Sequence, residues 1–85
     1  MTLVVQVDNK PGVLNRVASL FRRRGFNIES LTVGHTEKPG VSRMTIVVDT
    51  DEAGALRIEA NLYKLVHVQR VENVTSTPSV FRDLP

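Results

Sequence analysis

Four segments of this chain have the composition of β-strands. Each is short, is rich in the β-branched residues Val, Ile and Thr, and ends at a polar or turn-forming cluster. This combination is typical of strands. The pattern predicts strands at residues 2–8, 26–36, 41–50 and 67–75.

The third of these strands alternates between two faces. Met44, Ile46 and Val48 occupy every other position, so they share one face of a half-buried strand while polar side chains occupy the other. In the second strand, Ile28 and Leu31 are three positions apart, and they can share a face only if the strand contains a bulge. The sequence EKPG between the two strands is typical of a tight turn, which predicts an antiparallel hairpin.

Two other segments have the spacing of amphipathic helices. The first begins near Pro11 and is followed by Gly25, residues that suit the first turn of a helix and the left-handed position just beyond its end. In the second segment, Asp51 stands where an N-cap residue belongs. The apolar positions are Val13, Leu14, Val17, Leu20 and Phe21 in the first helix and Ala55, Ile58, Leu62 and Leu65 in the second.

Together these elements give the order βαββαβ. Right-handed βαβ crossovers in one antiparallel sheet place both helices on the same face, so the expected fold class is α+β, a ferredoxin-like sandwich. In that topology the first and third strands are central, and the second and fourth are edges. Because a long exposed edge invites pairing with another chain, the segment 26–36 predicts a homodimer formed through the second strand.

Composition limits what such a domain does. The chain has 85 residues, no cysteine, 41% hydrophobic and 24% charged residues and a formal net charge of +2, values that are ordinary for one small soluble domain. The lack of cysteine excludes a disulfide framework and a thiolate zinc site. No apolar run approaches the roughly 18 residues that span a bilayer. We therefore expect no membrane association and a location in the cytoplasm, or in the plastid stroma if the protein is organellar.

Ferredoxin-like domains serve several functions, and their sites must distinguish them. RNA-binding members stack bases on aromatic residues of the central strands. Neither central strand has one here, and the run Arg22–Arg24 is typical of a solvated helix end, so RNA binding through the sheet is only the weaker alternative and no nucleic-acid partner is expected. His35 and His67 lie on different strands as surface residues, so no metal site is expected. The acidic residues are scattered, and no nucleophile stands beside an activating base, so no catalytic residue is expected either.

The junction between the first strand and the first helix, DNKPGVLNR, is more suggestive. A helix N-terminus has unpaired backbone N–H groups and a partial positive charge that favour a carboxylate. Gly12 lets a ligand approach the backbone, and the side-chain amide of Asn9 can accept from an ammonium group or donate to a carboxylate. The same residues fit a simpler interpretation, in which Asn9 caps the helix, Pro11 begins it and Gly12 merely fits.

The chain also resembles a known family. A valine-rich strand followed by NKPGVLNRVASLFRRRGFNIESLTVG and SRMTIVV is similar to the amino-acid-sensing ACT domain. RRGFNIESLTVG followed by SRMTIVV looks like the small regulatory subunit of acetolactate synthase (acetohydroxyacid synthase) in particular, whereas PGVL alone is shared across ACT domains. We assign residues 1–77 to an ACT domain and residues 78–85 to a C-terminal tail. Many members continue into a second domain of similar size, so this chain is either the N-terminal domain of a longer protein or a short member.

This resemblance implies a regulatory function without catalysis. It implies feedback inhibition in branched-chain amino-acid biosynthesis, with valine, leucine or isoleucine as effector at the interface of two ACT domains. Thiamine diphosphate, magnesium and FAD would belong to the partner, the acetolactate synthase catalytic subunit, and no cofactor is expected in this chain. The alternative is a generic ACT module that senses another amino acid for another biosynthetic enzyme. The implied effector-binding residues are Asn9, Gly12, Val13 and Leu14 of one chain and Asn27 and Ile28 of its neighbour.

Overall fold

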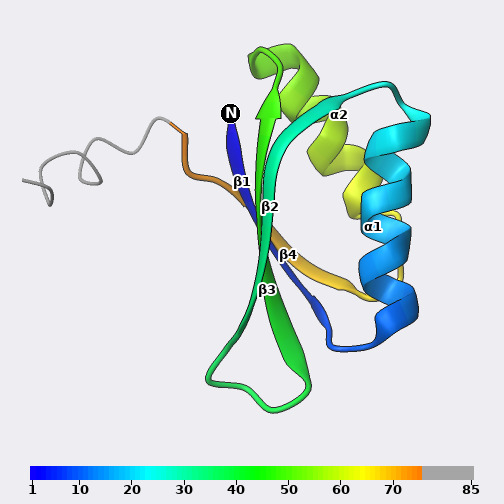
Figure 1. Ribbon diagram of the computed structural model, residues 1–85, viewed down its shortest axis with the longest axis vertical. Coiled ribbons are helices and arrows are strands. Elements are labelled where there is room, and N and C mark those ends of the chain that lie inside the picture. The colour runs from blue at the N-terminus through cyan, green and yellow to red at the C-terminus, as the bar shows by residue number, and fades with distance from the viewer. Residues whose placement is uncertain (76–85) are drawn as a thin grey trace, which may run out of the picture.

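The computed structural model describes residues 1–75 of the chain. Within these residues both helices lie on one face of a single sheet, and no helix covers the other face (Figure 1). The predicted α+β ferredoxin-like fold is therefore confirmed. No helix in the described part is long and apolar enough to cross a membrane. The elements are β1 Thr2–Asp8, α1 Pro11–Arg23, β2 Asn27–His35, β3 Val41–Asp49, α2 Glu52–Leu62 and β4 Val68–Asn73.

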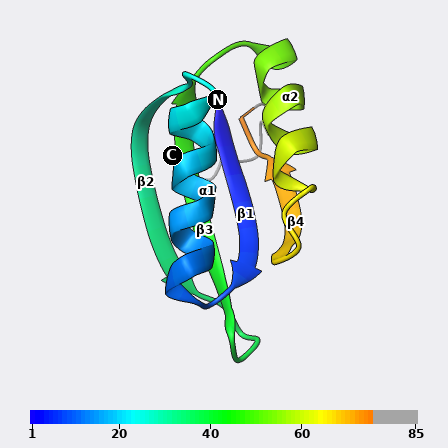
Figure 2. The same ribbon diagram turned by 90° about the vertical axis from the view of Figure 1, so that its right-hand side faces the viewer.

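The sheet has the strand order β2-β3-β1-β4, and all neighbouring strands are antiparallel. As predicted, β1 and β3 are central while β2 and β4 are edges; Figure 2 shows β2 and β4 on either side of the two central strands. Along β1, Leu3, Val5 and Val7 are fully buried and alternate with half-buried residues. This period of two is expected where helices cover only one face of a sheet.

β2 contains the bulge that its apolar spacing requires. Ile28 pairs with Val48 and Leu31 pairs with Ile46, whereas Glu29 has no partner and the register shifts there. The extra residue turns Leu31 back to the face that Ile28 occupies. Both partners on β3 are buried, so the two residues share the helix-facing side, as predicted.

The hydrophobic core lies between the sheet and the helices. Phe21 of α1 is the largest of the fully buried side chains among the described residues. The predicted helical stripes are confirmed, with Leu14 only half-buried and Leu65 lying beyond the end of α2, where it still packs against the core. The helices contribute Val13, Val17, Leu20 and Phe21 from α1 and Ala55, Ile58 and Leu62 from α2.

The N-terminal end of α1 differs from the simpler interpretation of the sequence. Lys10 is the N-cap residue, with an extended backbone (φ −133°, ψ 135°), and its side chain makes no capping hydrogen bond. Pro11 is the physical reason, because a proline ring disfavours the helical region for the residue before it. The interpretation in which Asn9 caps the helix is therefore wrong, and the role of Pro11 as first helical residue is confirmed.

The C-terminal end of α1 is a Schellman motif. The Gly25 amide donates to the Arg22 carbonyl, and the Phe26 amide donates to the Phe21 carbonyl. Gly25 has φ 74°, a left-handed conformation that glycine adopts without strain. The rings of Phe21 and Phe26 meet edge to face with centroids 6.4 Å apart. Gly25 thus ends the helix as predicted, and Phe26 anchors the chain just before β2.

The remaining predicted elements are present in the structure, but some of them begin or end at other residues. Asp51 caps α2 as predicted, since its Oδ1 accepts a hydrogen bond of 2.8 Å from the Gly54 amide. The second and fourth strands are shorter than the predicted 26–36 and 67–75, because Phe26 belongs to the helix-ending motif and His67 to the turn before β4. The predicted tail, residues 78–85, lies outside the described residues.

Candidate effector site

Four of the six candidate effector-binding residues lie together at the N-terminal end of α1. Asn9 and Gly12 are exposed, Leu14 is half-buried and Val13 is buried. The Asn9 amide donates to the Gly40 carbonyl at 2.8 Å, which ties this loop to the hairpin between β2 and β3. Because Asn9 is exposed and does not cap the helix, its side-chain amide is available to a ligand.

The backbone amides of this helix start are only partly available. The amides of Val13 and Leu14 both donate to the Lys10 carbonyl, at 2.9 and 3.3 Å, and Pro11 has no N–H. Of the backbone amides of Gly12, Val13 and Leu14, that of Gly12 is the one without such a bond to Lys10. The first turn has no acidic residue, so no carboxylate of its own neutralises the partial positive charge of the helix end.

The glycine at position 12 is not required by packing. A Cβ atom at Gly12 would meet no atom within 4 Å, and its φ lies outside the left-handed region. In contrast, a Cβ atom at Gly54 would lie 1.8 Å from the Thr50 hydroxyl oxygen. The fold therefore explains the glycine of α2 but leaves the one at the start of α1 for another role.

The other two candidates lie at the opposite end of α1. Asn27 is the exposed first residue of β2, and Ile28 is half-buried. α1 has 13 residues, so at 1.5 Å per residue its ends are about 20 Å apart. Figure 1 shows the β1–α1 loop and the start of β2 at opposite ends of that helix. One chain therefore does not bring the six residues together.

A polar cluster that the sequence pattern did not reveal lies next to Asn9. Asp8 Oδ2 lies 2.8 Å from His67 Nδ1, and Asp8 Oδ1 accepts a hydrogen bond of 2.7 Å from Gln69 Nε2. The hydrogen bond from His67 first, and then that from Gln69, lower the pKa of Asp8. His67 is therefore more than the isolated surface residue that the sequence predicts. Within residues 1–75, no group of three or more His, Asp or Glu side chains is placed to hold a metal ion.

Known proteins resemble this chain over nearly its whole length. Residues 3–70 match the sequence model of the AHAS small subunit-like ACT domain. The probable acetolactate synthase small subunit of Archaeoglobus fulgidus is 55% identical over 83 residues, and the acetolactate synthase small subunit of Mycobacterium avium is 53% identical over 83 residues. Each alignment covers 98% of this chain but only 52% and 50% of those relatives. The chain thus spans about half the length of the curated relatives it matches.

Solved structures agree with these matches. The acetolactate synthase small subunit from Thermotoga maritima superposes with a TM-score of 0.79 and 51% identity, over 84% of this chain and 44% of that chain. The ACT domain from GTP pyrophosphokinase of Chlorobium tepidum superposes with a TM-score of 0.73, over 88% of this chain and 84% of that chain, but at 16% identity it shows the fold alone. The match of residues 3–70 and these relatives show that the chain belongs to the AHAS small subunit-like ACT domains, the family found in small subunits of acetolactate synthase.

Proposed function

We propose that this chain is a non-catalytic regulatory subunit of acetolactate synthase, or its ACT domain. In this proposal it binds valine, or another branched-chain amino acid, at a homodimer interface for feedback inhibition. The observation that carries the proposal is the family match of residues 3–70. The position of the candidate residues at two ends of α1 supports it, because a complete site then needs two chains.

The N-terminal end of α1 supports the polar half of the site. The backbone amide of Gly12 and the positive helix end attract a carboxylate. The side-chain amide of Asn9 pairs with either charged group of an amino acid. Burying the isopropyl group of valine contributes about 1.5–3 kcal/mol. That gain separates valine from glycine or alanine more sharply than from leucine or isoleucine, which differ from valine by a single methylene.

β2 is the edge that we propose for the dimer. Leu31 and Val33 of this strand are 39% and 45% exposed. Their partners on β3, Ile46 and Met44, are buried on the same face, so Leu31 and Val33 extend the apolar layer of the core to the edge of the sheet. A second copy paired along β2 would cover them and use the free backbone groups of the edge.

Antiparallel pairing of two β2 strands would join the halves of the site. Within one chain, the end of β2 and the start of α1 lie at the same end of the molecule (Figure 1), because the Asn9 amide is bonded to Gly40 of the hairpin that follows β2. A two-fold partner running in the opposite direction places the start of its own β2, with Asn27 and Ile28, toward that end. Two identical sites would form, each from both chains.

A site shared between chains gives a route for regulation. Effector binding stabilises the dimer arrangement in which the two halves meet. Only the difference in effector affinity between one dimer arrangement and another can be passed on to a bound catalytic subunit. In this proposal, thiamine diphosphate, magnesium and FAD bind to the catalytic subunit.

Two measurements test the proposal. Mixing the chain with the acetolactate synthase catalytic subunit, with and without valine, should show a valine-dependent fall in activity. If neither the chain nor valine changes the activity of the catalytic subunit, the regulatory role is contradicted. Calorimetry on the chain alone, with valine, leucine, isoleucine, serine and phenylalanine, measures binding separately from regulation. Heat with phenylalanine and none with valine would favour a generic ACT module of another enzyme.

A further inference from the structure

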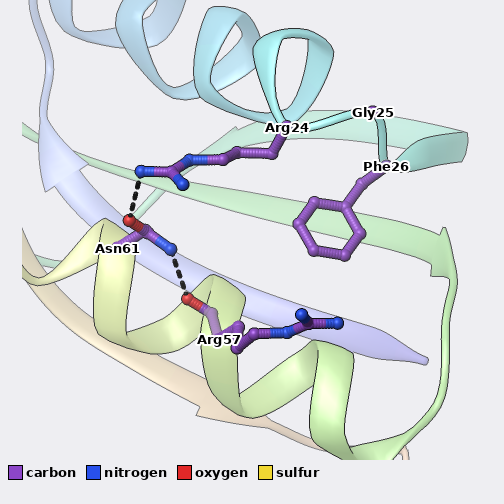
Figure 3. Close-up of a pocket in the computed structure, with 5 residues that line it drawn as sticks. All are labelled: Arg24, Gly25, Phe26, Arg57 and Asn61. Atoms are coloured by element: carbon purple, nitrogen blue, oxygen red, sulfur yellow. Dashed lines mark hydrogen bonds between the residues drawn. The ribbon is translucent and has the colours of Figure 1, made fainter.

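The C-terminal end of α1 and the facing side of α2 form a basic depression outside the candidate effector site. One cavity of about 260 Å³ lies between them (Figure 3). An adjoining cavity of about 310 Å³ is lined by Leu20, Arg23 and Arg24, so the two cavities share Arg24. The cavity of about 260 Å³ is lined by Arg24, Gly25, Phe26, Arg57 and Asn61. We call the residues that line either of these two cavities the basic surface.

Hydrogen bonds and ring packing hold this surface in place. Arg24 Nη2 donates to Asn61 Oδ1 at 3.0 Å, and Asn61 Nδ2 donates to the Arg57 carbonyl at 2.8 Å. In Figure 3 the Arg24 side chain reaches from the end of α1 toward Asn61 of α2, with the Phe26 ring beside it. Phe26 is itself fixed by its edge-to-face contact with Phe21. The basic surface is therefore a formed feature that joins two helices, whereas the arginine run alone predicts a solvated helix end.

The positive charges of the basic surface are not neutralised within the described residues. The ion pairs among residues 1–75 lie on and beside β1 and β4, and neither includes Arg23, Arg24 or Arg57. All three arginines are exposed. A guanidinium group presents several N–H donors in a fork that fits a carboxylate, and arginine is enriched in protein interfaces. The surface thus offers charge and hydrogen bonds to an acidic partner.

The basic surface is continuous with one half of the candidate effector site. Arg24, Gly25 and Phe26 lead directly into Asn27 and Ile28. The Schellman motif fixes the backbone of this segment at both Gly25 and Phe26. A partner bound to the basic surface therefore contacts the same rigid segment that supplies Asn27 to the neighbouring chain.

We infer that the basic surface is the docking site for an acidic segment of the acetolactate synthase catalytic subunit. This inference rests on the proposed function, which supplies the partner. Carboxylates of that segment pair with Arg24 and Arg57, and the half-buried Phe26 ring contacts their aliphatic parts. Effector binding at Asn27 then reaches the catalytic subunit through the segment between Arg24 and Ile28, because a shift of the dimer interface moves both ends of that segment together.

Charge-matched variants test the docking site. The affinity of the chain for the catalytic subunit is measured by biolayer interferometry over a range of salt concentrations. R24Q/R57Q should weaken association by about tenfold or more and should flatten its salt dependence. R16Q/R43Q removes the same charge from exposed positions outside the basic surface and should change affinity by less than about twofold. Because Arg24 also bonds to Asn61, R57Q alone is measured as well, with thermal unfolding of every variant to confirm folding.

Each outcome of this experiment is informative. Weaker association of R24Q/R57Q with unchanged valine binding supports docking at the basic surface. Wild-type affinity in R24Q/R57Q, or an equal loss in R16Q/R43Q, overturns it, since the second result reflects net charge alone. If R24Q/R57Q loses both valine binding and association with the catalytic subunit, the effect lies in the effector site. This result also overturns docking at the basic surface. If the wild-type chain does not associate with the catalytic subunit at all, the regulatory partnership itself fails, and the docking site fails with it.

Discussion

The hydroxyl of Tyr63 is bonded to both backbone groups of Val71 on β4. It accepts a hydrogen bond of 2.9 Å from the Val71 amide and donates one of 3.2 Å to the Val71 carbonyl. These two groups therefore point to the outer side of β4, away from β1. One side chain thus occupies the donor and the acceptor that an added strand would use at this position. The β4 edge is protected here, which leaves β2 as the edge for the proposed dimer.

Replacing Tyr63 with Phe should destabilise the fold and expose the β4 edge. The aromatic ring is kept while both hydrogen bonds are lost, so we expect a loss of about 1 kcal/mol, or about 4–8 °C in Tm for a domain of this size. Light scattering after size-exclusion chromatography should also detect assemblies larger than those of the wild type. Wild-type values of both Tm and mass would show that the hydroxyl does not protect the edge.

Val33→Lys should prevent dimer formation without unfolding the domain. The side chain is 45% exposed on β2, so a lysine remains solvated in the monomer but would bring a charge into the interface of a β2 dimer. We expect the dimer dissociation constant to rise at least about tenfold. Leu56→Lys, at a position on α2 that is 66% exposed, is the matched control. Sedimentation velocity should show a monomer only for the first variant, and a dimer in both would exclude β2 as the interface.

Gly12→Asp should abolish valine binding and leave the fold intact. The new side chain has open space, and a carboxylate in the first turn is favourable to the helix, so Tm should not fall. The same carboxylate repels that of the effector, so calorimetry should detect no heat with valine. Gly12→Ala, which adds bulk without charge, should weaken binding less. Retained valine affinity in the aspartate variant would disprove the assignment of this loop.

Asn27→Ala tests whether the second chain contributes to the effector site. The residue is exposed in the single chain, so its loss should not lower Tm. If β2 reaches the site of the neighbour, the loss of its amide should weaken valine binding by about 1 kcal/mol or more. Asn73→Ala, at the end of β4, is the control that removes an exposed amide elsewhere. An unaltered valine affinity in the first variant would count against a shared site.

The Asp8 and His67 pair predicts a loss of stability in acid. Their hydrogen bond, followed by that of Gln69, lowers the pKa of Asp8 below its ordinary value of 3.8. The folded state therefore binds this proton more weakly than the unfolded state, so Asp8 stabilises the fold above about pH 4 and loses that effect as the pH falls through the lowered pKa. Thermal unfolding between about pH 7 and about pH 2 should show the wild type more stable than Asp8→Asn at neutral pH but not in acid. A difference in Tm that is constant with pH would contradict this role.

Features that depend on neighbouring residues were predictable from the sequence. The stripe that includes Val17 and Phe21, the cap at Asp51 and the helix end at Gly25 all follow from spacing and local conformation, and the structure confirms them. The simpler interpretation assigned the N-cap of α1 to Asn9, which is the better capping residue by type, and that assignment is wrong. The constraint that Pro11 places on Lys10 outweighed that preference.

The candidate effector site was less accessible to such reasoning. The chemistry of the β1–α1 junction singled out Asn9 and Gly12, but only the resemblance to a family pointed to Asn27 and Ile28. No local pattern could connect them, because the two groups lie at opposite ends of α1 within one chain.

The element order, the two faces of each element and the need for a bulge in β2 could all be predicted from the sequence, because each of these depends on residues close together in the chain. Which polar side chains meet, in contrast, depends on how the elements pack in the folded chain. His67 and Asp8 are 59 positions apart, and Arg24 and Asn61 are 37 apart. The first pair meets through the register of β4 against β1, and the second through the packing of α1 against α2, and neither relation is encoded in local spacing.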